Sequence, residues 1–315
     1  MRTVSIVMCT YNGEKYLREQ LDSLLRQTYP IMELIIQDDG STDATSEIIN
    51  EYKTSYPDLN IIFYRNSINL GYNKNFFSAI LKAKGDYIAC CDQDDIWEPY
   101  KLELMMNNVG NATLIFHNSI LFNSETVIGK LHSRPLTEFP SSLNALMIPR
   151  SYGHQIMFRK DIKELLKPFA LLNLSYDYFI YSLSGVTGKI KYIDMPLVRW
   201  RRHENASTFS KQKHSEGKIN GYIKAIEALF KRSNMNTTRN YFRLYKSISI
   251  TDKTTKKIAD KMSEINFANF ISICYLCYKH KAELISDCSG IKQSLRSFFI
   301  PLFFVRDYGQ YILRK

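Results

Sequence analysis

The chain lacks a long apolar run and the glycine-rich loops that bind dinucleotides or nucleoside triphosphates. The apolar stretch Ser297–Val305 is far shorter than the ~20 residues that a membrane-spanning helix needs, and Pro301 interrupts it. No G-x-G-x-x-G follows the first predicted strand, and no G-x-x-x-x-G-K-[ST] occurs in the sequence. These absences argue against a spanning membrane protein, a dinucleotide-binding enzyme and a P-loop enzyme.

A signal peptide and a disulfide framework are also not expected. Met1-Arg2 leads directly into a predicted strand, without the apolar segment of a leader. Cys274-x-x-Cys277 has the spacing of zinc ligands, but no second pair follows and its surroundings resemble a helix face. Three other cysteines fall in apolar strand-like runs and are expected to be small buried side chains: Cys9, Cys90 and Cys91. We therefore predict a cytoplasmic protein without disulfides.

The positive charge is confined to the last third of the chain. Residues 1–206 contain 22 Lys and Arg against 23 Asp and Glu, whereas residues 207–315 contain 20 against 8, a net charge of +12. We predict two domains, 1–206 and 207–315, with a linker at Ser207–Lys218. The basic and aromatic second domain favours an anionic membrane surface as partner. A solvated basic helical face and nucleic-acid binding are the alternatives, and nucleic acid is the least expected.

Strand and helix patterns alternate over the first 120 residues. The predicted strands are Val4–Met8, Leu34–Gln37, Ile61–Tyr64 and Asp86–Cys91, and the predicted helices are Gly13–Gln27, Asp43–Lys53 and Tyr72–Lys84. This alternation predicts an α/β fold with parallel β-α-β units and helices on both faces of the sheet. Later strands are predicted at Leu114–His117, Ile120–Phe122, Ile190–Ile193 and Leu197–Trp200. Residues 219–315 are predicted to be mostly helical, with breaks at Asn234–Asn240 and Asp287–Gly290.

The segment Asp92-Gln93-Asp94-Asp95 places three carboxylates directly after the fourth predicted strand. In open α/β sheets, ligands bind at the carboxyl ends of the strands. Carboxylates packed this closely repel one another unless a cation offsets them, and Mg²⁺ or Mn²⁺ prefers oxygen ligands. The segment therefore indicates a metal site. The alternative is an acidic turn in which Asp95 caps a helix that begins near Trp97.

Three further polar clusters follow strands or precede helices. Thr10-Tyr11-Asn12-Gly13 offers an aromatic face and amide groups to a base or a ribose. Asp38–Asp43 offers an acceptor for a ribose hydroxyl or a pyrimidine N–H. Asn69–Asn75 is the third cluster. All of them are expected at the same edge of the sheet as Asp92.

Taken in order, these segments resemble the motifs of family 2 glycosyltransferases, which have the GT-A fold. The motifs are Val4–Asn12, Gln27–Pro30, Asp38–Asp43, Asn69–Gly71 and Gly85–Asp95, and the resemblance covers about residues 2–206. It implies a Rossmann-like, mixed but mostly parallel sheet with helices on both faces, followed by a mostly α-helical C-terminal region. It also implies that Tyr11 and Asp39 hold the nucleoside base, and that Asp92 and Asp94 form the D-x-D that meets ribose, Mg²⁺ or Mn²⁺ and diphosphate. The rest of the expected donor-binding set in these clusters is Thr10, Asn12, Asn69, Gly71 and Asn73.

The resemblance also implies a catalytic base and an acceptor side. Ser175–Phe179 matches the segment that usually carries the base at the start of a helix, which makes Asp177 the candidate. The alternative is that Asp177 only caps this helix. Relatives often have His-Asp-Trp here, so Tyr176 and Tyr178 are departures that would reshape the acceptor pocket. His154 and Gln155, in the preceding segment, are expected to line the acceptor side.

Pro196–Asn205 resembles a segment found in polysaccharide-building members of the family, including rhamnosyltransferases. By this resemblance Arg201 and Arg202 clamp the diphosphate, and His203 is a third metal ligand or a phosphate contact. A purely structural His203 is the alternative. The Q-x-x-R-W motif of processive synthases is absent, which favours one sugar per encounter.

The sequence thus predicts a metal-dependent inverting hexosyltransferase that uses a nucleotide-diphospho sugar. The expected acceptor is a saccharide or lipid-linked saccharide of surface polysaccharide, as in O-antigen or capsule assembly, with a rhamnosyltransferase as one candidate. The expected location is peripheral, on the cytoplasmic face of the inner membrane. The rivals are a sugar nucleotidyltransferase and a non-catalytic basic protein that binds membrane or nucleic acid. The donor sugar, the linkage and the oligomeric state are not predicted.

Overall fold

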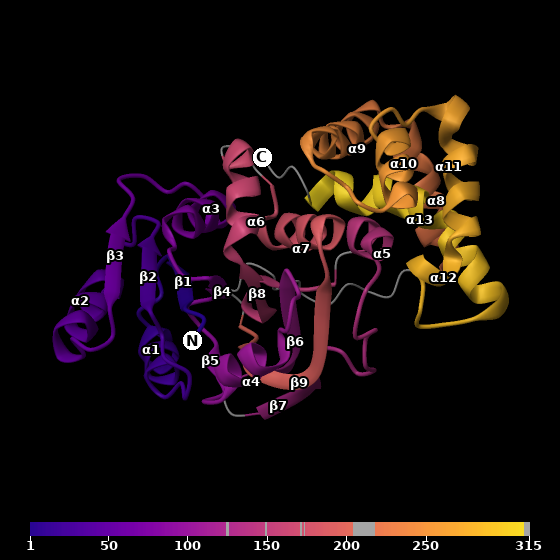
Figure 1. Ribbon diagram of the computed structural model, residues 1–315. Helices are drawn as coiled ribbons and strands as arrows, with labels where there is room; N and C mark the ends of the chain where they lie inside the picture. Colours follow the sequence, from indigo (N-terminus) through magenta and orange to yellow (C-terminus); the bar gives the residue numbers. More distant parts are fainter. Residues whose placement is uncertain (124–125, 149, 171, 173, 204–217, 312–315) are drawn as a thin grey trace.

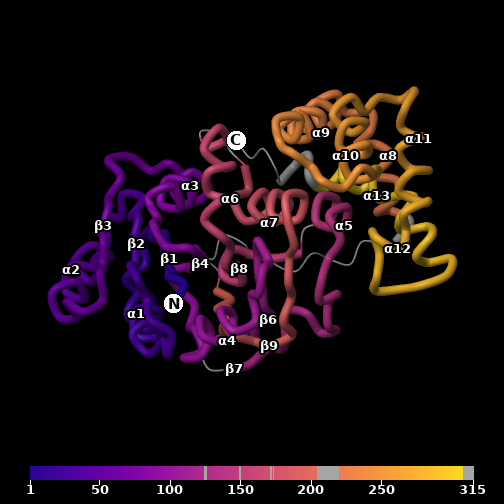
Figure 2. Tube along the Cα trace, in the orientation of Figure 1, coloured from indigo at the N-terminus to yellow at the C-terminus, as the bar shows by residue number. Residues whose placement is uncertain are grey.

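The structure, a computed structural model, describes residues 1–123, 126–148, 150–170, 172, 174–203 and 218–311 (Figures 1 and 2). Its centre is one nine-stranded mixed sheet with the strand order β3-β2-β1-β4-β8-β6-β9-β5, and β7 pairs with β6. The strands are β1 (Val4–Thr10), β2 (Glu33–Asp38), β3 (Ile61–Arg65), β4 (Tyr87–Cys91), β5 (Ile96–Trp97), β6 (Leu114–Asn123), β7 (Thr126–Lys130), β8 (Ile156–Arg159) and β9 (Ile190–Arg201).

The parallel half of the sheet is confirmed. β1 pairs in parallel with β2 and with β4, and β2 pairs in parallel with β3. Every residue of β1, β2 and β4 is buried, as expected for apolar strands covered on both faces. The carboxyl ends of these strands therefore meet at one edge. The antiparallel pairs β4–β8, β6–β8 and β5–β9 make the sheet mixed.

Helices cover both faces of the sheet and create two apolar cores. One core contains apolar residues of α1 (Leu17–Leu25), α2 (Thr45–Ser55) and α4 (Lys101–Asn108). The other contains residues of α3 (Tyr72–Lys82), α5 (Ser142–Met147), α6 (Lys160–Leu166) and α7 (Tyr176–Thr187). The short 3₁₀ helices are Gly153–Gln155, Lys167–Phe169 and Tyr245–Ser247.

Four predicted strands join into two longer ones, and one helix begins later than predicted. β6 and β9 each run unbroken across the interruptions that the sequence indicated, because their parallel pairing absorbs register shifts around Asn118. The side-chain amide of Asn118 donates to the carbonyl of His132 and to Asp194, which supports the irregular ladder. The helix expected near Trp97 begins at Lys101, after the short strand β5, and Asp95 accepts a hydrogen bond from the Arg201 backbone instead of capping it.

The C-terminal region is mostly helical, as predicted. Its helices are α8 (Lys218–Phe230), α9 (Arg232–Leu244), α10 (Lys253–Met262), α11 (Phe267–Lys279), α12 (Lys281–Leu284) and α13 (Gly290–Tyr311). Cys274 and Cys277 are buried on α11, which confirms that they are core residues. The break expected at Asn234–Asn240 is wrong, because this segment lies inside α9 and buries Met235 and Thr238.

The C-terminal helices pack against the sheet domain through one continuous apolar core. Polar contacts add to this packing: the Asn144 side chain donates to the carbonyl of Leu284 at 2.6 Å, and the Ser182 hydroxyl contacts those of Tyr241 and Tyr245. The predicted boundary at 206/207 and nearly all of the linker lie outside the described residues, so the division into two domains stays a prediction. Among the described helices, none combines the length and apolarity needed to cross a membrane.

Candidate active site

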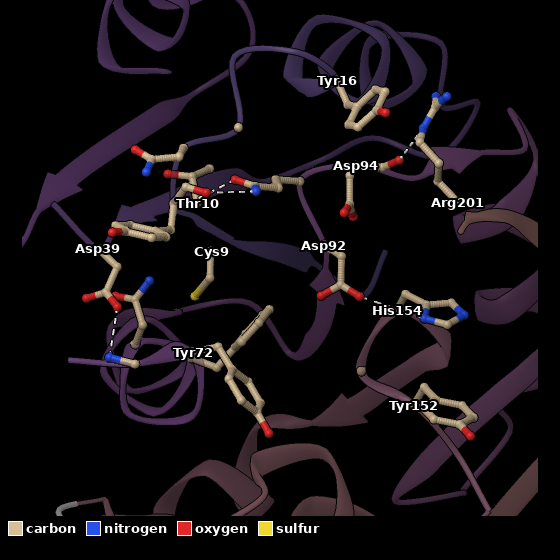
Figure 3. Close-up of a pocket in the computed structure, with 18 of the residues that line it drawn as sticks. Cys9, Thr10, Tyr16, Asp39, Tyr72, Asp92, Asp94, Tyr152, His154 and Arg201 are labelled. Carbon is tan, nitrogen blue, oxygen red and sulfur yellow. Dashed lines mark hydrogen bonds and ion pairs between the residues drawn. The ribbon is translucent and has the colours of Figure 1, made fainter. Parts of the chain in front are cut away.

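A pocket of about 1050 Å³ opens at the carboxyl edge of β1, β2 and β4 (Figure 3). Its wall also includes the start of α3, the start of α7 and the end of β9. Residues 152–154 contribute as well, so the structure brings together polar side chains from seven separate segments of the chain. The predicted site residues that line the pocket are Thr10, Tyr11, Asn12, Asp39, Asn69, Gly71, Asp92, Asp94, His154, Tyr176, Asp177, Arg201, Arg202 and His203.

Two predicted site residues, Asn73 and Gln155, lie behind the wall of this pocket. Asn73 is buried and accepts a hydrogen bond from the backbone N–H of Tyr176 at 3.2 Å. Gln155 is buried, donates to the carbonyl of His117 and accepts from the backbone N–H of Tyr152. Each ties one wall segment to another and positions the residues that do line the pocket.

The Tyr11 ring is held over the pocket by its backbone. Gln93 accepts from the Tyr11 N–H at 2.9 Å and donates to the Tyr11 carbonyl at 3.0 Å, so one side chain grips both backbone groups. Asn12 follows with φ 47, a left-handed conformation that Asn tolerates better than most residues. Its side chain accepts from the Thr42 N–H. The ring itself is 48% exposed and presents a flat apolar face.

Asp39 fixes the loop that precedes α3. Its Oδ1 accepts from the Asn66 side chain and the Leu70 N–H, and its Oδ2 accepts from the Gly71 N–H at 2.9 Å. Gly71 has φ +80, which a side chain would strain. Because an ionised carboxylate has about four acceptor positions, three bonds leave it able to accept one more from a ligand.

The carboxyl groups after β4 have two different environments. Asp94 Oδ2 lies 2.8 Å from His203 Nε2, and both side chains are largely buried. The Asp92 side chain is 34% exposed and faces His154 across 3.8 Å (Figure 3). Burial among protein atoms, reinforced by the charges of Asp94 and Asp177, raises the pKa of Asp92 to about 7. A bound cation would offset this accumulation of negative charge.

A fully buried lysine, Lys101, lies beneath the carboxylates. Its ammonium group donates to the His154 carbonyl at 2.8 Å and lies 3.2 Å from the centre of the Trp97 ring. Burial lowers the pKa of Lys101 to about 7. In turn, the positive charge of Lys101 counteracts the rise in the pKa values of Asp92 and Asp95. This lysine is an internal counter-charge for the acidic cluster.

The residues around Asp92 suit a divalent cation, because carboxylate oxygens and imidazole nitrogens are good ligands for Mn²⁺. Ligand atoms of Asp92, Asp95 and His154 all lie within 4.8 Å of one another. The buried Asp95 Oδ2 and His154 Nδ1 have no hydrogen-bond partner among the described residues. The predicted set of Asp92, Asp94 and His203 does not form a comparably tight group, since only Asp94 and His203 are in contact.

The two predicted arginines are held differently. Arg201 donates to the Asp94 carbonyl at 2.8 Å and to Glu19 at 2.6 Å, and its guanidinium lies over the Tyr16 ring. Through these contacts the Arg201 side chain stabilises the loop that carries Asp94. Arg202 lies 4.5 Å from the centre of the Trp200 ring and lines the pocket.

Asp177 lies in the first turn of α7, where the partial positive charge of a helix N-terminus favours a carboxylate. Its Oδ1 accepts from the Ser175 hydroxyl at 2.7 Å and from the Tyr178 N–H at 2.8 Å. Burial nevertheless raises the pKa of Asp177 above its ordinary value. Tyr176, beside it, is stacked on Phe76 with ring centres 4.0 Å apart.

The family of the chain follows from comparison with known proteins. The sequence profile of Glycosyl transferase family 2 matches residues 5–177, more than half of the chain. The chain belongs to glycosyl transferase family 2. The matched range includes Asp39, Asp92, Asp94 and Asp177, all of which line the pocket.

Relatives and solved structures agree with this family. An uncharacterised protein of Mycobacterium tuberculosis is 30% identical over 247 residues, which cover 72% of this chain and 67% of that protein. The dTDP-rhamnosyl transferase RfbG of Shigella flexneri is 29% identical over 63% of this chain and 72% of its own length. The crystal structure of Staphylococcus aureus TarS residues 1–349 matches with a TM-score of 0.57 at 16% identity, over 96% of this chain and 87% of that one. The predicted GT-A fold and its helical C-terminal region are thereby confirmed.

Several pocket residues of this family 2 enzyme were not predicted as site residues. Gln93 stands inside the acidic motif, so its position there was an available signal. Lys101, which lies beneath the pocket and does not line it, had no signal, because a lysine in a helical pattern normally faces solvent. The other unpredicted lining residues include Tyr16, Tyr72, Tyr152, Gly153 and Trp200. They come from segments whose proximity only the fold creates.

Proposed function

We propose that this enzyme transfers one sugar, with inversion, from a nucleotide-diphospho donor to a hydroxyl of a saccharide or lipid-linked saccharide. The observation that carries the proposal is the convergence of three groups on one pocket. These are an aromatic-and-carboxylate pair at Tyr11 and Asp39, the acidic cluster at Asp92 and Asp94, and an isolated carboxylate at Asp177. In the same order, these groups suit the binding of a nucleoside base, the binding of a diphosphate with its cation, and the deprotonation of an acceptor hydroxyl.

The nucleoside would lie between Tyr11 and Asp39. The exposed ring of Tyr11 offers a stacking face, and the remaining acceptor position of Asp39 suits a pyrimidine N–H or a ribose hydroxyl. The Thr10–Asn12 turn and the Asn69–Gly71 loop would close around it. Arg202 would contact the diphosphate, while Arg201 would position the Asp94 loop through its bonds to Glu19 and the Asp94 carbonyl.

Asp94 and His203, with Asp92, would hold Mg²⁺ or Mn²⁺. These three side chains line the pocket, whereas Asp95 is fully buried. When bound, the cation would stabilise the negative charge that develops on the departing diphosphate. Asp95 and Lys101 would instead support the cluster from below.

Asp177 would act as the general base. It removes the proton of the acceptor hydroxyl while the acceptor oxygen bonds to the anomeric carbon of the sugar. The bond from that carbon to the diphosphate oxygen breaks, and its electron pair leaves with the nucleoside diphosphate. The raised pKa of Asp177 makes it a stronger base than an ordinary aspartate. Attack by the acceptor oxygen on the side opposite the leaving group would invert the anomeric carbon.

Relatives support an acceptor in surface polysaccharide synthesis. RfbG is a dTDP-rhamnosyl transferase, and a putative colanic acid glycosyl transferase of Escherichia coli is 30% identical over half of this chain. A structurally similar mannosyltransferase of Pyrobaculum calidifontis was solved with GDP-Man and Mn²⁺, at a TM-score of 0.50. A rhamnosyl donor is one candidate on these grounds. We place the reaction at the cytoplasmic face of a membrane, with residues 1–206 catalytic and residues 207–315 contacting the lipid surface.

The test is a panel of nucleotide sugars incubated with purified protein and Mn²⁺, scored by nucleoside diphosphate release. We expect one donor to be consumed, Asp94→Ala to lose turnover and bind that donor more weakly, and EDTA to abolish activity. Asp161→Asn removes an exposed carboxylate outside the pocket and should leave turnover unchanged. Release of pyrophosphate instead would identify a nucleotidyltransferase and refute the proposal.

A further inference from the structure

The C-terminal helices expose large apolar side chains along one face of each of two helices. On α11 they are Phe267, Ile271, Tyr275 and Tyr278, which repeat at the spacing of a single helical stripe. On α8 they are Tyr222, Ile223, Ile226 and Phe230. Phe230, Phe267 and Ile271 are 72%, 60% and 62% exposed, values unusual for apolar residues gathered in a patch.

The two stripes form one surface. The rings of Phe230 and Phe267 are in contact, with centres 5.3 Å apart, and they join the end of α8 to the start of α11. At the other end of α11, Lys281 lies over the Tyr278 ring and donates to the Ser294 hydroxyl of α13, the helix that exposes Ile291 and Leu295. We call this surface, made of the exposed apolar residues of α8, α11 and α13, the α11 face. Helix α11 itself lies on the side of the molecule opposite β3 (Figure 1).

The α11 face is bordered by positive charge. Lys279 lies 4.9 Å from the centre of the Tyr275 ring, and Lys281 lies 5.1 Å from that of Tyr278. Lys231 directly follows Phe230, and Lys292 directly follows Ile291; both are exposed. The sequence of α11 contains no acidic residue, and α8 contains one.

Two nearby carboxylates are paired with cations, and a third contacts a histidine. Glu283 contacts His280, Asp287 contacts Arg296, and Glu264 contacts Lys246. They do not cancel the lysines that border the apolar residues. The local field is therefore positive, in keeping with the net charge of +12 over residues 207–315.

We propose that the α11 face docks on an anionic lipid bilayer, with Ile271 and Phe267 entering the headgroup boundary and the lysines contacting lipid phosphates. Aliphatic side chains beside lysines fit this occupant, because the apolar groups leave water and the ammonium groups stay among the headgroups. A second copy of the chain fits less well, since two such basic regions repel each other. Nucleic acid would leave the isoleucines without a partner, because its binding depends on phosphate contacts and base stacking.

The experiment is co-sedimentation of the full-length protein with vesicles, without donor or acceptor. Vesicles of phosphatidylcholine with phosphatidylglycerol are compared with vesicles of phosphatidylcholine alone. We expect the wild type to prefer the anionic vesicles. Phe267→Ser with Ile271→Ser should weaken binding about tenfold or more, since the burial of one large apolar side chain is worth at least a factor of about ten.

The charge component has its own variant. Lys279→Gln with Lys281→Gln should weaken binding roughly fivefold per lysine at low salt. At 0.5 M salt the Debye length is only about 4 Å, so screening removes most of the lysines' contribution from the wild type as well. The difference in vesicle binding between the wild type and this variant should therefore shrink. A matched control replaces the exposed apolar pair Val127 and Ile128 of β7 with serine, and this change should leave vesicle binding intact.

Other outcomes would overturn the proposal. Failure of the wild type to bind anionic vesicles would do so, as would equal binding to neutral ones or an equal loss in the β7 control. A dimer that dissociates in the Ile271→Ser protein would identify a second copy as the occupant. Thermal melts of each variant check folding. Asp177→Asn should bind vesicles like the wild type, so failure of the proposed catalysis and failure of docking are distinguishable.

Discussion

The Asp177→Asn protein separates catalysis from folding. Asparagine keeps an oxygen in the position of Asp177 Oδ1, so the hydrogen bonds from the Ser175 hydroxyl and the Tyr178 N–H can persist. What it loses is the negative charge and the ability to take a proton. If Asp177 is the base, turnover should fall about 10²- to 10⁴-fold, the usual contribution of a general base. That loss corresponds to about 3–5 kcal/mol in the activation barrier.

The same substitution should stabilise the folded protein at neutral pH. Burial raises the folded-state pKa of Asp177 above the ordinary value of 3.8, so the folded state holds this proton more tightly than the unfolded state. Its contribution to stability is therefore lost as pH rises from about 4 through the folded pKa, and the ionised carboxylate is a cost at pH 7.5. Asparagine does not carry that cost. The advantage of the variant should grow between acid and neutral pH.

Two assays measure these effects. Initial rates of nucleoside diphosphate release, with saturating donor and acceptor, give the catalytic loss, and nucleotide binding by calorimetry should be unchanged. Thermal unfolding at pH 4.5 and pH 7.5 gives the stability change, with Asp161→Asn as the exposed-carboxylate control. Full turnover in the variant would remove Asp177 as the base. A melting temperature below that of the wild type at pH 7.5 would refute the argument from burial.

Three further substitutions test the support of the pocket. Lys101→Met removes the buried counter-charge and should lower the free energy of unfolding by about 3 kcal/mol in denaturant titrations. Lys160→Met, at an exposed ion pair, should lower it by less than about 1 kcal/mol. Equal losses in the two variants would contradict the role of Lys101 as a counter-charge. Gly153→Ala would place a Cβ 1.7 Å from the Tyr176 hydroxyl, so we expect a lower kcat with donor affinity retained. Unchanged kinetics would show that the Tyr176 ring can move away from the added methyl group. Gly71→Ala would force a side chain into φ +80, which should cost about 1–2 kcal/mol and weaken donor binding; a variant with wild-type stability and affinity would argue that the loop relaxes.

Much of the fold was predictable because its signals are local. Buried strands such as β1 and β4 are short apolar runs, and the amphipathic helix around Leu21 has its apolar residues on one face. The parallel arrangement of the first four strands followed from the alternation of strand and helix patterns alone. The lengths of β6 and β9 were not predictable, because each strand is continued by hydrogen bonds to the other rather than by its own propensity.

The residues of the candidate site were likewise predictable where the signal is local and not where it depends on tertiary contacts. Residues that follow strands, such as Asp39 and Asp92, were placed at the rim because strand ends meet there. Asn73 and Gln155 also carry polar side chains in the right segments, yet their hydrogen bonds to Tyr176 and His117 hold them behind the pocket wall. Whether a polar group faces a ligand or a neighbour depends on contacts between distant segments.

The sequence by itself determined the family, the GT-A class of fold, and which acidic residues lie at the rim, because motif order and apolar periodicity are properties of contiguous residues. Only the tertiary structure decided that Arg201 is committed to Glu19 and that Lys101 is buried beneath the carboxylates. It alone joined the stripes of α8 and α11 into one surface through Phe230 and Phe267. Burial and pairing arise from segments far apart in the chain, and no local pattern encodes which of them will touch.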